Sequence, residues 1–79
     1  MVNMKPVASR NLQAVGYDRK TRKLYARFHG CDKTYVYQNV PPLFWKALQL
    51  ADSKGSFFQE WIVGNFKYEV VDEVAPPAL

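Results

Sequence analysis

Aromatic rings and basic side chains are the groups of this chain best suited to chemistry, and they lie close together in the sequence. Tyr25 and Arg27 alternate with apolar residues, and Tyr35 and Tyr37 repeat that spacing. Residues two apart in an extended strand share one face. Rings and cations on one exposed sheet face can stack bases and hold phosphates. The pattern therefore predicts a protein that binds RNA or single-stranded nucleic acid. The predicted contact residues are Arg19, Lys20, Arg22, Lys23, Tyr25, Arg27, Tyr35 and Tyr37.

The direction of Tyr35 and Tyr37 decides between two interpretations. If Val36 joins the core, both rings share an open face with Tyr25, and Tyr17 can join them from the preceding strand. A one-residue change of register reverses the two faces, and the tyrosines then fill the core instead. Both interpretations remain open from the sequence.

Positive charge is concentrated in the first part of the chain. Residues 1–33 carry a net charge of +6 and residues 34–79 a net charge of −2. One-sided basic charge favours polyanion partners. Four of the cations lie within residues 19–23, where a turn is expected. We expect phosphate contacts from this turn, and an ordinary solvated hairpin turn is the alternative.

A second candidate site is the segment from Ser53 to Ser56. Ser53, Lys54 and Gly55 are candidate anion-binding residues, because N–H groups at a helix start and a nearby lysine attract anions. The alternative is a tight turn between two helices, with glycine for backbone freedom. Ser56 would then be the N-cap of a helix from 57 to about 63, with Gln59 completing a capping box.

Residues typical of catalysis and metal binding are sparse. His29 and Cys31 are the candidate nucleophile pair, but Gly30 between them predicts a turn. One histidine and one cysteine fall short of a four-ligand metal site. The acids show no spacing typical of a general acid–base pair. The sequence therefore predicts a non-enzymatic protein without a metal or cofactor.

The hydrophobic pattern predicts an α+β fold. Short strands over 12–17, 23–29 and 34–38 form an antiparallel three-stranded meander packed against two short helices. The first helix, over 43–51, follows two prolines, and a further strand is expected over 66–71. One domain is expected over residues 1–79, with a core over about 7–71 and a flexible tail over 74–79.

Composition narrows the class of protein. No apolar run approaches the ~20 residues of a membrane span, and the first residues lead into no apolar signal segment. The single cysteine, Cys31, cannot form an internal disulfide. A reducing cytoplasm is therefore the expected compartment, and no membrane partner is expected.

The number of aromatic residues supports an alternative function. Five Phe, five Tyr and two Trp exceed what the core of a 79-residue chain can hide, and aromatic residues dominate interface hot spots. The alternative is a protein-interaction module or a small regulator or inhibitor of a larger enzyme. A homodimer could equally bury Trp45, Trp61 and Phe57 against a second copy.

Several of these segments, in this order, resemble the KTSC domain family over about residues 7–68. The matching elements are Val15-Gly16-Tyr17-Asp18, Leu24 with Phe28, Tyr35-x-Tyr37, Val40-Pro41, Ala51-x-Ser53-x-Gly55, Phe58 and Ile62. Where such sequences often carry paired serines near the start, this chain has Ser9-Arg10. The family is named for its place at the C-terminus of some lysyl-tRNA synthetases and includes standalone bacterial and phage proteins. The resemblance implies RNA binding and nothing more specific.

Overall fold

The computed structural model describes residues 4–31 and 33–72. The tail predicted over 74–79 lies outside the described residues. Within the described ranges, none of the helices has the length and apolar composition that crossing a membrane requires.

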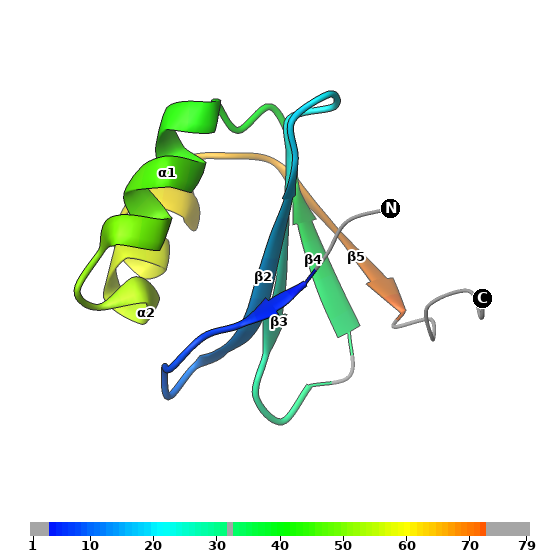
Figure 1. Ribbon diagram of the computed structural model, residues 1–79. Helices are drawn as coiled ribbons and strands as arrows, with labels where there is room; N and C mark the ends of the chain where they lie inside the picture. Colours follow the sequence, from blue (N-terminus) through cyan, green and yellow to red (C-terminus); the bar gives the residue numbers. More distant parts are fainter. Residues whose placement is uncertain (1–3, 32, 73–79) are drawn as a thin grey trace.

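Within the described ranges, five antiparallel strands form one sheet, and their order in the sheet follows the chain. The elements are β1 (Lys5–Pro6), β2 (Leu12–Asp18), β3 (Lys23–Phe28), β4 (Lys33–Tyr37), α1 (Pro42–Leu50), α2 (Lys54–Phe57), η1 (Phe58–Ile62) and β5 (Tyr68–Asp72). Figure 1 shows the helical segments together on one side of the sheet. The other side carries no helix among the described residues. We call the two sides the covered face and the open face, although Val36 and Thr34 on the open face are only 6% and 7% exposed.

The predicted α+β meander is confirmed, and so is the further C-terminal strand, which is β5. The short strand β1 was not predicted, because Pro6 interrupts the pattern and only Lys5 and Pro6 pair with β2. Helix α1 begins at Pro42, one residue before the predicted start. Proline suits that first position because its missing N–H has no partner there in any helix.

The second helical segment begins three residues earlier than predicted. Ser53, not Ser56, is the N-cap of α2, because the Ser53 side chain accepts a hydrogen bond from the Ser56 N–H. The segment then widens into the π-helical turn η1, in which the Val63 N–H donates to the Phe58 carbonyl oxygen at 3.0 Å. The capping-box interpretation based on Ser56 and Gln59 is therefore wrong.

The core lies between the helices and the covered face of the sheet. Leu24 and Ala26 alternate along β3 and are fully buried, as the period-2 pattern predicts. Leu48 of α1 and Phe58 of η1 are buried against them. The remaining buried members of this cluster are Leu12, Val15, Tyr37, Val40 and Ile62.

Candidate functional site

The pairing of β3 with β4 settles the direction of Tyr35 and Tyr37. Tyr37 lies opposite Leu24 and Tyr35 opposite Ala26. Directly opposed residues of antiparallel strands share one face, so both tyrosines lie on the covered face. The prediction that they share the open face is wrong, because the register pairs Val36, not a tyrosine, with Tyr25. The alternative, in which both tyrosines face inward, is confirmed.

The open face is less aromatic than predicted and mixed in charge. Tyr25 and Arg27 do lie there, opposite Val36 and Thr34, and both are half-buried. Glu69 of β5 also pairs with Val36 and therefore adds an acid to this face. Of the predicted stacking rings, only Tyr25 belongs to the open face of the described sheet.

Tyr17 also lies on the covered face, where it stacks on Trp45 of α1. The two ring centroids are 5.6 Å apart and the planes differ by 13°. The Tyr17 hydroxyl donates a hydrogen bond to the Val40 carbonyl oxygen. Burial raises the pKa of Tyr17, while the positive charges of Arg22 and Arg19 act in the opposite direction. This aromatic pair therefore adjoins the cationic turn, a proximity that the sequence did not reveal because Trp45 lies off the centre of the apolar helix face.

We call Arg19, Lys20, Arg22 and Lys23 the basic turn. The first three are exposed and Lys23 is half-buried. Among the described residues none of the four pairs with an acid. Asp18 instead accepts hydrogen bonds from the backbone N–H groups of Lys20 at 2.9 Å and Thr21 at 3.4 Å.

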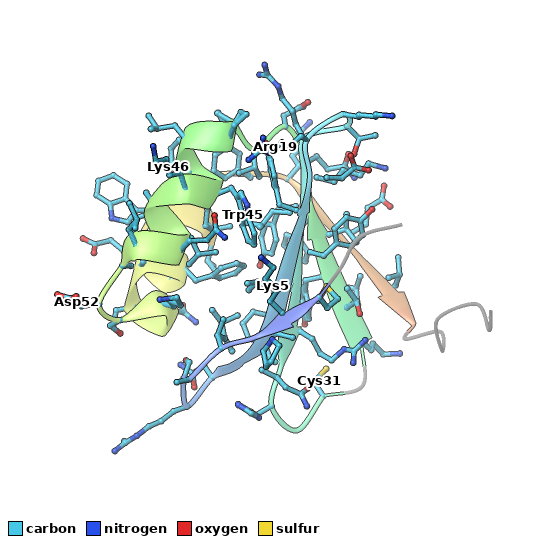
Figure 2. The ribbon with its side chains drawn as sticks, viewed as in Figure 1. Lys5, Arg19, Cys31, Trp45, Lys46 and Asp52 are labelled. Carbon is cyan, nitrogen blue, oxygen red and sulfur yellow. The ribbon has the colours of Figure 1, made fainter. Side chains whose placement is uncertain are left out.

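The backbone of the basic turn is fixed at both ends. The hydrogen bond from the Lys20 N–H is the main reason that the pKa of Asp18 is lowered, so this carboxylate stays ionised as a turn cap. The Arg22 carbonyl oxygen accepts from the Val40 N–H at 2.9 Å, and Arg22 itself has a φ of 58°. Figure 2 shows Arg19 at this end of the sheet, above Trp45. The turn therefore holds its cations at one end of the molecule, as the sequence predicted.

Tyr35 and Tyr37 line a hollow of about 310 Å³ between η1 and strands β4 and β5. We call it the phenolic hollow. Its lining residues are Phe28, Cys31, Tyr35, Tyr37, Gln59, Val63 and Tyr68. The ring of Tyr68, which is 54% exposed, lies 5.5 Å from that of Tyr35 and 5.3 Å from that of Tyr37.

The hydroxyl groups of the phenolic hollow are available for hydrogen bonding. Those of Tyr35, Tyr37 and Tyr68 form no hydrogen bond with any described residue, and none is a buried, unsatisfied atom. Burial, followed by the nearby phenols of Tyr68 and Tyr35, raises the pKa of Tyr37 to about 12. Tyr37 therefore keeps its proton at neutral pH. Apolar walls with a few polar groups are a feature that this hollow shares with ligand sites.

A second hollow, of about 350 Å³, lies between the β1–β2 connection and the start of α2. Ser9 is one of its lining residues, and the Ser9 hydroxyl oxygen accepts hydrogen bonds from the N–H groups of Asn11 and Leu12, both at 3.2 Å. Gly55 approaches so closely that a Cβ there would lie 2.7 Å from the Ser9 hydroxyl oxygen. Glycine is thus favoured at this position by a contact with a residue far away in the sequence.

The candidate anion-binding residues Ser53, Lys54 and Gly55 all have contacts within the protein. The Ser53 side chain caps α2, and the Lys54 ammonium donates to the Ala51 carbonyl oxygen at 3.1 Å. Gly55 is buried and lies against Ser9. The tight-turn interpretation therefore accounts for all three residues.

His29 and Cys31 are directed to different partners. A ring nitrogen of His29 lies 3.1 Å from the Ser9 carbonyl oxygen. The Cys31 N–H donates to Phe28 across a turn at Gly30, whose φ is 78°, while Cys31 also lines the phenolic hollow. No hydrogen bond joins the two side chains within the described ranges, and no group of three or more metal-ligating side chains gathers there.

Comparisons with known proteins agree with the fold. The KTSC domain model matches residues 8–66. A relative from Tsukamurella paurometabola is 38% identical over 64 residues, which cover 81% of this chain and 94% of that protein. The crystal structure of a KTSC domain protein from Yersinia pestis has a TM-score of 0.83 at 31% identity, covering 95% of this chain and all of that chain. The resemblance found in the sequence is confirmed, and the chain belongs to the KTSC domain family.

Proposed function

We propose that this KTSC domain is a non-enzymatic module that binds RNA or another single-stranded nucleic acid. The observation that carries the proposal is the basic turn, whose four cations have no acidic partner among the described residues. Unpaired cations on a fixed turn can neutralise phosphates without the cost of breaking an internal ion pair. Such contacts give affinity and position rather than sequence preference.

The phenolic hollow supplies the stacking surface that the open face lacks. Tyr68 is the most exposed ring of the three tyrosines, and Tyr35 and Tyr37 lie beside it. An exposed ring can stack a base of any sequence, and a phenol hydroxyl can donate to a base edge.

The basic turn and the phenolic hollow are close enough to contact one short strand. Tyr37 lies opposite Leu24, the residue that follows Lys23 in the chain. From strand geometry the Cα atoms of Tyr37 and Lys23 are roughly 6 Å apart. One nucleotide strand can therefore place a phosphate at the turn and a base on Tyr68.

The salt dependence of binding tests the role of the basic turn. For three to four neutralised phosphates on a single strand, log affinity should fall with log salt at a slope of about −2 to −3. We would measure fluorescence anisotropy of labelled single-stranded RNA and DNA across a salt series. Replacing Arg19 and Lys20 by Gln should flatten the slope by about 1.4, since each lost contact contributes about 0.7.

The matched control replaces Lys5 and Arg10 by Gln. Both residues are exposed, and replacing them removes the same charge. They lie outside the basic turn, with Lys5 in β1 and Arg10 before β2. The control should leave the slope near that of the unmodified chain. A salt-independent affinity, or equal loss in both double variants, would contradict specific phosphate contacts at the turn.

Stacking in the hollow is tested at Tyr68. Tyr68→Ala should weaken binding about 5- to 150-fold, since a stacked base contributes roughly 1–3 kcal/mol. Tyr68→Phe keeps the ring and should retain most of the affinity. Since Tyr68 is 54% exposed, neither change should greatly affect folding. Unchanged affinity in Tyr68→Ala would remove the hollow from the binding surface.

A protein partner is the second candidate, favoured by the large apolar side chains on the helical layer. Leu43 and Leu50 of α1 are 72% and 74% exposed, and Trp61 of η1 is 49% exposed. Leu43 and Leu50 are seven residues apart and so lie on one side of α1. Contiguous exposed apolar surface marks interaction sites. Two results together would favour this candidate over the first. The chain would bind no nucleic acid at low salt, and it would capture one defined protein that the Trp61→Ala variant does not capture.

A further inference from the structure

The two edges of the sheet are built differently. The edge strand β1 has two residues, one of them a proline, and Lys5 beside it is exposed. Short length, proline and lysine are the usual means by which a sheet edge is protected from pairing. At the other edge, β5 has five residues without a proline, and it pairs only with β4 in the described part of the chain. The β5 edge therefore lacks the protection that β1 has.

The side chains of β5 also favour pairing. Tyr68, Val70 and Val71 are 54%, 44% and 40% exposed. Aromatic and β-branched residues are those that gain most from neighbours across strands. An unprotected edge with such residues on both faces is suited to a further strand.

We infer that β5 pairs antiparallel with β5 of a second copy, which joins the two sheets into one. In a two-fold symmetric antiparallel pair, one central residue lies opposite itself, and residues equally far before and after it lie opposite each other. Centred on Val70, the pairing places Val70 opposite the partner's Val70 and Glu69 opposite the partner's Val71. Centred on Glu69, it would instead place two carboxylates directly opposite each other, which is destabilising. Of these two registers, charge favours the one centred on Val70.

This pairing goes beyond the proposed function and does not depend on it. The symmetry axis is perpendicular to the sheet, so both helical layers lie on the same face of the joined sheet. Tyr68 lines the phenolic hollow and belongs to the pairing strand. The dimer would therefore bring the two phenolic hollows to either side of the new interface, on one face.

The mass of the whole chain in solution tests the inference without any nucleic acid. Sedimentation equilibrium should give twice the 9.1 kDa of one chain at high concentration. Val70→Lys should shift the mass to that of one chain. Leu50→Lys is the matched control, because Leu50 is exposed on α1, and it should leave the dimer intact. Circular dichroism checks that both variants are folded.

A cysteine at position 70 tests the register. In a Cys31→Ser background, Val70→Cys should form a disulfide-linked dimer on oxidation, since the two residues are directly opposed. Leu43→Cys, which is more exposed, should not. A chain that stays monomeric throughout would overturn the inference, and so would a dimer that survives Val70→Lys and is not cross-linked through position 70. A monomer whose β5 amides are protected from hydrogen exchange would show that the chain covers its own edge, which also overturns it.

Discussion

Because Gly55 lies against Ser9, we expect Gly55→Ala to destabilise the unmodified chain but not a chain that lacks the Ser9 hydroxyl group. A Cβ at Gly55 would lie 2.7 Å from the Ser9 hydroxyl oxygen, whereas the Ser9 Cβ is 3.9 Å away, an ordinary contact. In Gly55→Ala the hydroxyl must therefore move. It cannot move freely, because it accepts hydrogen bonds from the N–H groups of Asn11 and Leu12.

The expected magnitude follows from those two hydrogen bonds. Each contributes about 1 kcal/mol, so displacing the Ser9 hydroxyl costs about 2 kcal/mol. Alanine stabilises a helix by up to about 1 kcal/mol relative to glycine, which offsets part of this loss in α2. Gly55→Ala should therefore lower the free energy of unfolding by about 1 kcal/mol. In a Ser9→Ala background there is no hydroxyl to displace, and the same change should be neutral or stabilise by up to about 1 kcal/mol.

A double-mutant cycle measures this coupling. Urea unfolding of the four proteins should give a coupling free energy of about 2 kcal/mol between the two positions. Thermal unfolding should show Gly55→Ala lowering Tm by about 4–8 °C in the unmodified chain, as 1 kcal/mol does for a domain of this size. A coupling free energy below about 0.5 kcal/mol would refute the reasoning, because it would mean that positions 9 and 55 affect stability independently of each other.

Three further predictions concern stability. The folded state holds the Tyr37 proton more tightly than the unfolded chain, because burial raises the pKa of Tyr37 to about 12. The free energy of unfolding should therefore decline from about pH 10 to pH 12. Urea titrations of Tyr37→Phe should show a shallower decline. Ser53→Ala should lose about 1 kcal/mol by removal of the α2 cap, while Ser56→Ala loses less; the reverse order would restore Ser56 as the cap. Gly64 has a φ of 88°, so Gly64→Ala should lose about 1 kcal/mol, measurable by calorimetry, and an unchanged Tm would contradict this.

The elements could be predicted because their signals are local. Leu24 and Ala26 alternate with polar residues, and the two prolines at 41 and 42 precede a helical period, so strand and helix follow from neighbours in the chain. The basic turn was predicted for a similar reason. Charged side chains in a tight turn lie in solvent whatever the register of the adjoining strands.

The face occupied by Tyr35 and Tyr37 could not be predicted. Both faces of β4 carry residues that favour strands, with Thr34 and Val36 on one and the two tyrosines on the other. The period-2 pattern therefore cannot choose between them. The choice comes from the pairing of Ala26 with Tyr35, which depends on the length of the connection between β3 and β4. The contact between Ser9 and Gly55 is equally non-local.

The fold accounts for most of the residues that match the family, and what remains bears on function. The core contains Val15, Leu24, Val40, Phe58 and Ile62. Turns are stabilised by the caps Asp18 and Ser53 and by the close contact of Gly55. These roles would be needed whatever the domain binds.

Tyr35 and Tyr37 are different, because the fold uses their rings but not their hydroxyl groups. Phenylalanine would supply the same packing against Phe28 and Phe58. The two hydroxyl groups have no hydrogen-bond partner among the described residues, and burial raises the pKa of Tyr37 to about 12, so its hydroxyl group is a neutral donor at physiological pH. A protonated phenol beside an anionic ligand donates a hydrogen bond without adding repulsion. The fold therefore explains the two rings, and the proposed nucleic-acid binding gives their hydroxyl groups a role.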